Sequence, residues 1–268
     1  MTTPHPQQDL SGTTALITGA SAGLGAEFAR QLASQGCSLV LVARNRARLE
    51  ETAAGLERRY GTTAEVLPAD LTDDAGVAAV VERLSDPRRP VGILVNNAGI
   101  GLLHNFEDNP ISEEKKHLKL HGETAMELTH AALKGMLERG GGRIINVASI
   151  AAFLPRGTYS AAKAWLLSFS RWANLAYGKQ GIKVTAVCPG FTHTEFHDRM
   201  GMDKSVVPSW AWLDAERVVR EGLADNARGK AVSVPSKRYK VVAAVARVAP
   251  ARLVAGPPRK PKQGQAPK

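Results

Sequence analysis

The stretch Thr14-Ala-Leu-Ile-Thr-Gly-Ala-Ser-Ala-Gly-Leu-Gly25 decides the fold. Its first five residues form a short apolar run typical of a buried strand, and Gly19 ends this run. The glycine-rich residues lead into Leu24–Gln35, where apolar residues recur at the 3.6-residue period of a helix. A strand, a glycine-rich turn and a helix in this order form the place where a doubly wound fold holds a dinucleotide pyrophosphate. The alternative is a purely structural turn, because a glycine-rich run alone is weak evidence.

Strands and helices continue to alternate along the rest of the chain. Buried strands are predicted at 14–18, 38–43, 64–67, 91–95, 143–147, 183–187 and 230–234. Further helices are predicted at 46–59, 73–84, 112–139 and 157–180. Strands that alternate with helices of this length imply right-handed crossovers between parallel strands. The sequence therefore predicts an α/β fold, a Rossmann-type doubly wound parallel sheet of about seven strands with helices on both faces.

The chain has 268 residues, which is enough for one large domain with a sizeable core. We expect a disordered N-terminus at 1–9, a single Rossmann domain at 10–235, a basic helical extension at 236–255 and a disordered basic tail at 256–268. Within the extension, residues 237–248 have the pattern of a helix with basic side chains on an apolar body.

Positive charge is confined to the C-terminal end. Residues 226–268 contain eleven Lys or Arg and no Asp or Glu, so the net charge of +10 leaves −1 for the rest of the chain. Such a region attracts an acidic partner, and an anionic membrane surface and an acidic carrier protein both fit. A solvated tail without a partner is the alternative. Nucleic acid is not expected, because no nucleic-acid-binding motif accompanies the charge.

Composition predicts a soluble folded protein, with 44% hydrophobic and 22% charged residues. Cys37 and Cys188 lie far apart in apolar stretches, so neither a disulfide framework nor a metal site is expected. The first ten residues lack a basic n-region and an apolar h-region, and no apolar run is long enough for a membrane span. We therefore expect a cytoplasmic protein, and the basic end leaves peripheral membrane contact open.

The end of the second predicted strand indicates which dinucleotide would bind. A carboxylate at this position binds the ribose 2′-hydroxyl of NAD, whereas an arginine accommodates the 2′-phosphate of NADP. Here Val42-Ala43-Arg44-Asn45-Arg46 contains no acid and two guanidinium groups, with Arg44 nineteen residues after Gly25. This favours NADPH, since a planar guanidinium suits phosphate. The alternative is that both arginines are merely exposed residues at a helix start.

Five motifs occur together in one order along the chain. They are Thr18–Gly25, Asn96-Asn-Ala-Gly99, Ser149, Tyr159-Ser-Ala-Ala-Lys163, and Pro189-Gly190 with Thr194. The set resembles the short-chain dehydrogenase/reductase family over about residues 10–235, and most of all bacterial carbonyl reductases and 3-oxoacyl reductases. The resemblance implies an enzyme that transfers hydride from NADPH to a ketone or a 3-oxoacyl group. It also implies a homodimer or a homotetramer.

The resemblance assigns the catalytic roles. Tyr159 would be the proton donor, Lys163 would supply an ammonium group and hold the nicotinamide ribose, and Ser149 would orient the substrate carbonyl. Positions 159 and 163 lie one helical turn apart on the same face, so both side chains can reach one site. We expect the ammonium group and the oxidised nicotinamide to bring the pKa of Tyr159 closer to neutral.

The resemblance also assigns the cofactor contacts. These are Gly19, Ser21, Gly23, Leu24, Gly25, Arg44, Asp70, Leu71, Asn97, Ala98, Gly99, Tyr159, Lys163, Pro189, Gly190, Thr192 and Thr194. Residues 191–213 would form a lid over the substrate, with Phe196, Met200, Met202, Trp210 and Trp212 as an apolar lining. An apolar substrate, such as an acyl chain, follows from this lining. The alternative is that these side chains only pack the lid onto the sheet.

Two departures from the family pattern bear on activity. His121 stands where most relatives have an asparagine that holds a water in the proton relay to the lysine, although an imidazole can itself move protons. Ser149 and Tyr159 are ten residues apart, a shorter loop than in most relatives, which would shift one side chain from the other. A cofactor-binding protein with weak or no activity is therefore the alternative to a reductase. A third hypothesis is a binding protein in which the basic helix is the functional part.

Overall fold

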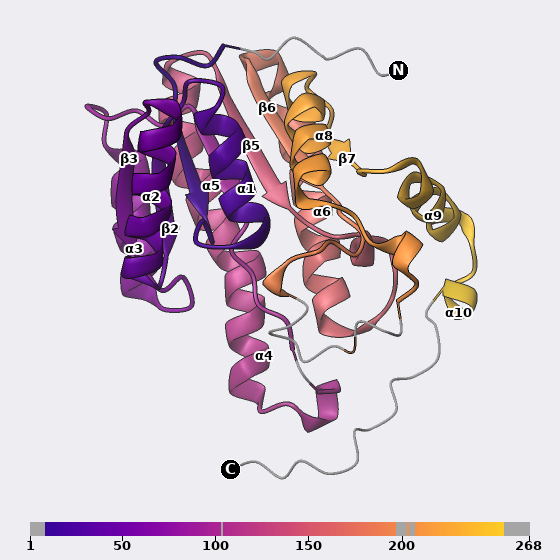
Figure 1. Ribbon diagram of the computed structural model, residues 1–268. Coiled ribbons are helices and arrows are strands. Elements are labelled where there is room, and N and C mark those ends of the chain that lie inside the picture. The colour runs from indigo at the N-terminus through magenta and orange to yellow at the C-terminus, as the bar shows by residue number, and fades with distance from the viewer. Residues whose placement is uncertain (1–8, 103, 197–202, 204–206, 255–268) are drawn as a thin grey trace.

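Seven parallel strands form one sheet in the order β3-β2-β1-β4-β5-β6-β7 in the computed structural model (Figure 1). The structure describes residues 9–102, 104–196, 203 and 207–254. The strands are β1 Thr14–Thr18, β2 Ser38–Ala43, β3 Ala64–Pro68, β4 Ile93–Asn96, β5 Gly142–Val147, β6 Ile182–Val187 and β7 Val232–Ser233. This confirms the predicted α/β class, and each predicted apolar run is a strand.

Helices cover both faces of the sheet. One face carries α1 Gly23–Ala33, α2 Arg46–Tyr60 and α8 Ala215–Ala227, and the other carries α3 Asp74–Ser85, α5 Thr124–Glu138 and α6 Gly157–Tyr177. Each layer buries its own core against the strands, with Phe28 and Val218 in the first and Val80 and Met136 in the second. The strands are apolar on both sides because both sides are covered.

The helix predicted at 112–139 contains a π turn, although its backbone stays helical from α4 into α5. The structure divides it into α4 Ile111–Leu118, a π-helical turn Lys119–Glu123, and α5. His121 lies in this turn and is only 2% exposed, and its ring packs directly against Gly99. An apolar period cannot reveal such a turn, since π turns are single-turn insertions that often accompany functional sites.

The order of the strands fixes where the motifs meet. The chain leaves β1 toward β2 and β3, and then continues from β4 in the opposite direction, so the crossover direction reverses between β1 and β4. Open α/β sheets bind ligands at this point, beyond the carboxyl ends of the strands. Gly19, Arg44, Asn97, Ser149 and Pro189 come directly or shortly after the ends of β1, β2, β4, β5 and β6.

A helical extension follows β7 at the edge of the sheet (Figure 1). It consists of α9 Lys237–Val248, with the predicted bounds, and the short α10 Ala251–Val254. The segments expected to be disordered, 1–9 and 256–268, lie outside the described residues except for Asp9. In the described parts of the chain, no helix has the length and apolar character needed to cross a membrane.

Candidate active site

A cavity of about 570 Å³ opens at the carboxyl ends of the strands. The predicted site residues in its wall are Gly19, Ser21, Gly23, Leu24, Arg44, Asp70, Leu71, Asn97, Ala98, Gly99, His121, Ser149, Tyr159, Lys163, Pro189, Gly190, Thr192 and Thr194. These residues come from six strand ends and three helical segments, so the fold brings distant motifs to one site. Among the predicted catalytic residues and cofactor contacts, Gly25 is the one that does not line the cavity.

Gly25 lies behind the glycine-rich turn. A Cβ atom at this position would lie 2.1 Å from the carbonyl oxygen of Gly19, so a larger residue would push the turn away from helix α1. Gly19 and Gly23 have φ values of +67° and +56°, in the left-handed region that favours glycine. Gly25 therefore shapes the turn, and the other residues of the motif form the cavity surface.

The Asn96–Gly99 segment is fixed to the same turn. The hydroxyl oxygen of Thr18 accepts hydrogen bonds from the backbone N–H groups of Asn97 and Ala98, each at 2.9 Å. The amide nitrogen of Asn97 donates to the carbonyl oxygen of Thr18 at 2.8 Å. These bonds hold the ends of β1 and β4 in register where the strand order reverses.

Two arginines from α2 and the turn before it line the far end of the cavity. Nη1 of Arg44 lies 3.9 Å from Oδ2 of Asp70, and Nη1 of Arg48 lies 3.4 Å from Oε2 of Glu195. Arg46 instead pairs with Glu50 and does not line the cavity. Sequence reasoning missed Arg48, although it lies four residues after Arg44 in the first turn of α2, where the Asn45 side chain caps its backbone N–H.

Tyr159, Ser149 and Lys163 meet in the opposite half of the cavity. The side chains of Tyr159 and Ser149 share a hydrogen bond, and Nζ of Lys163 lies 5.8 Å from the centre of the tyrosine ring. Lys163 donates to the carbonyl oxygen of Val147 at 2.7 Å. The short loop does not separate Ser149 from Tyr159, because residues Ile150–Phe153 coil into a 3₁₀ turn that the Ser149 hydroxyl caps.

Burial shifts the two titratable groups in opposite directions. It raises the pKa of Tyr159 to about 12, and the hydrogen bond with Ser149 lowers this pKa only in part. It lowers the pKa of Lys163 to about 7. In the protein without a nucleotide, desolvation therefore outweighs the Ser149 hydrogen bond, and the shift of this pKa toward neutral expected with the oxidised nicotinamide stays a prediction. Near pH 7 the phenol is protonated, which is the form that can donate a proton.

Two histidines pack against Tyr159. The ring centres of His117 and His121 are 4.5 Å apart, and they lie 5.8 Å and 5.7 Å from that of Tyr159. Burial, followed by the charge of Lys163, lowers the pKa of His117 to about 4 and that of His121 well below its ordinary value. Both imidazoles are therefore neutral at pH 7. Sequence reasoning missed His117, since a lone histidine on a helix has no local signal.

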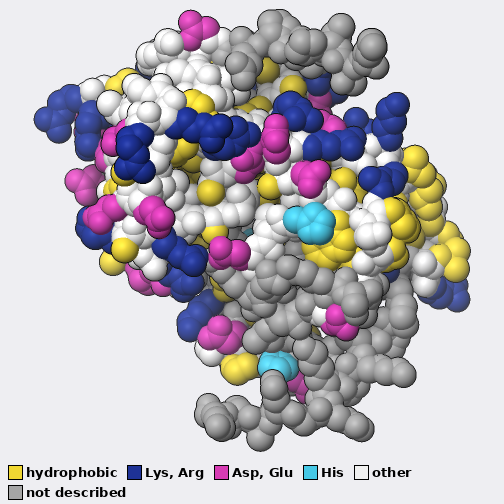
Figure 2. Space-filling view, in the orientation of Figure 1, with side chains coloured by type: hydrophobic (Ala, Val, Ile, Leu, Met, Phe, Trp, Pro, Cys, Tyr) yellow, Lys and Arg dark blue, Asp and Glu magenta, His cyan; other side chains and the backbone are white. Residues whose placement is uncertain are grey.

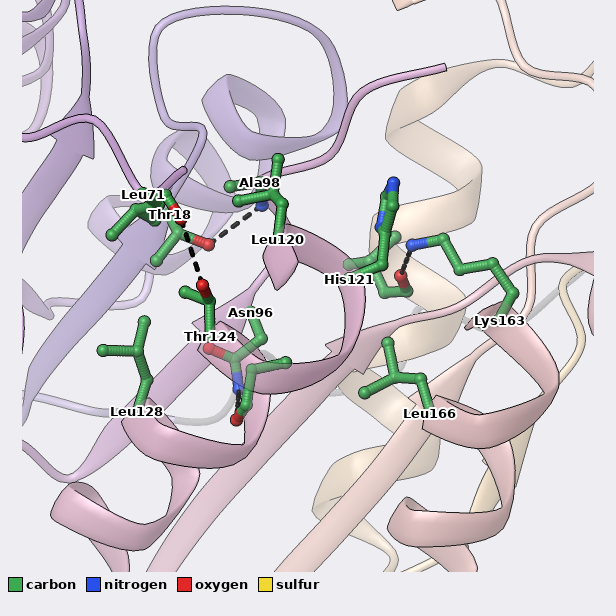
Figure 3. Close-up of a pocket in the computed structure, with 12 residues that line it drawn as sticks. Thr18, Leu71, Asn96, Ala98, Leu120, His121, Thr124, Leu128, Lys163 and Leu166 are labelled. Atoms are coloured by element: carbon green, nitrogen blue, oxygen red, sulfur yellow. Dashed lines mark hydrogen bonds between the residues drawn. The ribbon is translucent and has the colours of Figure 1, made fainter. Parts of the chain in front are cut away.

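The two ring nitrogens of His121 differ in their contacts. Nε2 lies 2.8 Å from the carbonyl oxygen of Ile100, and Nδ1 has no hydrogen-bond partner among the described residues. A second cavity of about 10 Å³, the size of one water molecule, lies between His121, Lys163 and Asn96. Figure 3 shows His121 and Lys163 on one side of this small cavity, and Thr18 and Leu71 on the other.

The described part of the lid packs over the Tyr159 end of the cavity. Phe196 lines the cavity, and its ring centre lies 6.2 Å from that of Tyr159. Trp212 stacks on His193 at 4.9 Å, whereas Trp210 is 64% exposed. Phe196 therefore fits the predicted apolar lining, and the two tryptophans do not line the cavity. Met200 and Met202 lie outside the described residues.

Comparison with known proteins places the chain among enzymes of one family. The family model described as short chain dehydrogenase matches residues 13–205. The ketoacyl reductase HetN of Nostoc sp. is 35% identical over 187 residues, which are 68% of this chain and 64% of that protein. The match thus spans less than two thirds of this relative's length.

Solved structures agree over a longer part of the chain. A short-chain dehydrogenase from Sphingobium yanoikuyae in complex with NADPH is 33% identical, covers 95% of this chain and 98% of its own, and has a TM-score of 0.81. A bulky-bulky ketone specific alcohol dehydrogenase from Comamonas testosteroni is 32% identical, with coverage of 86% and 90% and a TM-score of 0.76. With this fold, these motifs and these matches, the chain belongs to the short-chain dehydrogenase/reductase family of oxidoreductases.

Proposed function

We propose that the chain is an NADPH-dependent carbonyl reductase of an apolar ketone or 3-oxoacyl substrate. The observation that carries the proposal is the buried, protonated Tyr159, hydrogen-bonded to Ser149 in the wall of the large cavity. Reduction of a ketone builds negative charge on its oxygen, and a proton donor must reach that oxygen. The pair supplies the donor and a hydroxyl that orients the carbonyl.

The cavity residues suit NADPH. The backbone of Gly19–Leu24 opens α1 and would hold the pyrophosphate, and Arg44 with Arg48 would bind the 2′-phosphate. The adenine would lie beside Asp70 and Leu71. The ribose and nicotinamide would contact Asn97, Ala98, Gly99, Lys163 and the 189–194 segment, which includes Pro189, Gly190, Thr192 and Thr194. NADPH supplies the hydride when it is bound.

Residues of the chain would donate the proton to the substrate and then replace it. Tyr159 donates its hydroxyl proton to the substrate oxygen, and the Lys163 ammonium group stabilises the phenolate that remains. The water-sized cavity beside His121 then offers a route by which the lysine regains a proton. The neutral His121, with Nδ1 facing no partner among the described residues, can serve this relay in place of the asparagine of most relatives.

Two observations support an apolar substrate. Phe196 lies against the tyrosine ring at the cavity wall, and the relative from Comamonas testosteroni is named for bulky ketones. One of the two reasons to expect weak activity, the short loop, no longer applies, because Ser149 and Tyr159 remain in contact. We further propose a cytoplasmic homodimer or homotetramer, in which the basic end meets either an anionic membrane or an acidic carrier protein.

Consumption of NADPH in the presence of ketones tests the proposal. We expect the purified protein to oxidise NADPH with bulky aryl or alkyl ketones or 3-oxoacyl thioesters, and a Tyr159→Phe variant to lose this activity. A Tyr159→Phe variant with unchanged turnover would refute the role of the tyrosine. Absence of turnover with every such ketone, despite NADPH binding, would favour the inactive alternative.

A further inference from the structure

The outer face of α9 is apolar although it faces solvent. Tyr239 and Ala243, four residues apart, are the buried side of the helix. Val241, Val245 and Val248 point to the opposite side and are 63%, 52% and 84% exposed. A surface helix normally turns its apolar stripe toward the core. This helix has a second stripe that turns outward, and a stripe of this kind marks an interaction site.

Basic side chains flank the valine stripe, and acids are absent from this end of the chain. The exposed Lys237, Arg238, Lys240 and Arg247 belong to α9 itself. Residues 226–268 contain no Asp or Glu. Asp225 on α8 already pairs with Arg228 and Lys230. Glu221 on α8 approaches the start of α9, where it accepts from the backbone N–H of Ser236, and it already pairs with Arg217. The charged side chains of α9 itself are therefore all positive. Figure 2 shows hydrophobic side chains gathered over α9 and α10, with Lys and Arg side chains around them.

Tyr239 fixes α9 against the lid. Its hydroxyl donates to the carbonyl oxygen of Ala211 at 2.8 Å and accepts from the backbone N–H of Phe191 at 3.2 Å. The exposed Trp210 belongs to the same surface, since the Arg238 guanidinium lies 5.9 Å from the centre of its ring. The valine stripe and an exposed tryptophan of the lid thus belong to one apolar surface with basic side chains beside it.

We propose that this surface binds an anionic phospholipid bilayer, with the valines and Trp210 inserted among the headgroups. Lysine and arginine at the edges can extend their charged ends to lipid phosphates while apolar side chains enter the interface, and tryptophan favours this depth. A second copy of the chain fits less well, because pairing would bring two basic surfaces together. A bilayer suits the surface better than an acidic protein, because the three valines are each at least 52% exposed and offer apolar area that a lipid layer would bury.

Membrane binding would also place the lid at the bilayer. The Ser209–Ala211 turn lies against Tyr239 and would share the interface. An apolar ketone concentrates in the bilayer and would reach the site from there. This last step rests on the proposed function, whereas lipid binding itself does not.

Vesicle sedimentation of the full chain tests the proposal. We expect the protein to sediment with vesicles of phosphatidylcholine and roughly 30% phosphatidylglycerol and to stay in solution with pure phosphatidylcholine. We also expect release at about 0.5 M salt, because the Debye length there falls well below the ~8 Å of physiological salt. The variant Val241→Asn/Val245→Asn/Val248→Asn should lose binding by about tenfold or more, since it removes inserted area and leaves the charge unchanged. The control Ile111→Asn/Leu175→Asn alters side chains that are 63% and 81% exposed on α4 and α6, and it should bind like the parent protein.

Three results would overturn the proposal. Equal binding of the valine variant and the parent would assign lipid binding to charge alone. Self-association that the valine variant abolishes, without vesicle binding, would assign the stripe to a second copy. Binding to an immobilised acidic acyl carrier protein but not to vesicles would assign it to a protein partner. Turnover of a water-soluble ketone without vesicles is measured alongside, so a loss of the proposed enzyme activity is seen separately from a loss of lipid binding.

Discussion

Burial at the level of single residues sets the chemistry of Tyr159, because it keeps the phenol protonated near pH 7. We predict that Tyr159→Phe lowers reductase turnover by at least ~100-fold, since it removes the general acid. NADPH binding, measured by fluorescence, should change little. Tyr177→Phe is the matched control, because Tyr177 packs on Trp172 away from the cavity. A similar loss in both variants would mean that the effect is structural.

The buried amine of Lys163 lowers the stability of the fold, and this effect can be measured. Its pKa of about 7 in the folded chain lies below that of an exposed lysine, so the unfolded chain binds more protons between about pH 7 and pH 10.5. Burial of the Lys163 amine therefore lowers the free energy of unfolding most below pH 7, and this loss disappears as the pH rises to 10.5. We predict that Lys163→Met stabilises the fold by roughly 3 kcal/mol at pH 7, after the lost hydrogen bond to Val147 is subtracted, and abolishes turnover.

Chemical unfolding at several pH values measures this effect. The stability gain of Lys163→Met should shrink as the pH rises from 7 to 10. Lys183→Met is the control, because Lys183 also donates to a backbone carbonyl oxygen but is only partly buried. A gain for Lys163→Met that does not depend on pH would show that the buried amine is not its source.

A substitution at His121 distinguishes an active reductase from a weakly active one. An asparagine at this position can still hydrogen-bond the carbonyl oxygen of Ile100, so we predict that His121→Asn leaves kcat within a few-fold of the parent. A kcat that rises by an order of magnitude would instead show that histidine impairs the relay. The measurement is steady-state turnover with saturating NADPH and one ketone.

At the level of elements, the contact between the Pro189–Thr194 segment and α9 is tight. A Cβ atom at Gly190 would lie 2.0 Å from the ring of Tyr239, which two hydrogen bonds hold in place. We predict that Gly190→Ala destabilises the fold by ~1–3 kcal/mol, as overpacking does. The same change in a Tyr239→Ala background should cost much less. A double-mutant cycle from unfolding curves measures this coupling, and additive effects would contradict the contact.

The sequence predicts the strands well and the π turn not at all. Buried parallel strands are short apolar runs bounded by glycine or polar residues, so they can be found locally. The turn at Lys119–Glu123 carries His121, whose ring packs against Gly99, a residue distant in the chain, so local sequence gives no sign of it. For the same reason, the motifs locate Tyr159 and Lys163, whereas His117 and Arg48 become visible only when the helices are placed around the cavity.

At the scale of the whole molecule, the proposed function requires that one cavity hold NADPH between Arg44 and Tyr159. A fluorescence titration with NADPH and, separately, NADH tests this most directly. We predict that NADPH binds at least ~10-fold more tightly, because charged hydrogen bonds to the 2′-phosphate are each worth more than about 1 kcal/mol. Arg44→Ala/Arg48→Ala should abolish the preference, and Arg46→Ala, which alters an arginine paired outside the cavity, should retain it. Binding of neither nucleotide, or tighter binding of NADH, would contradict the account.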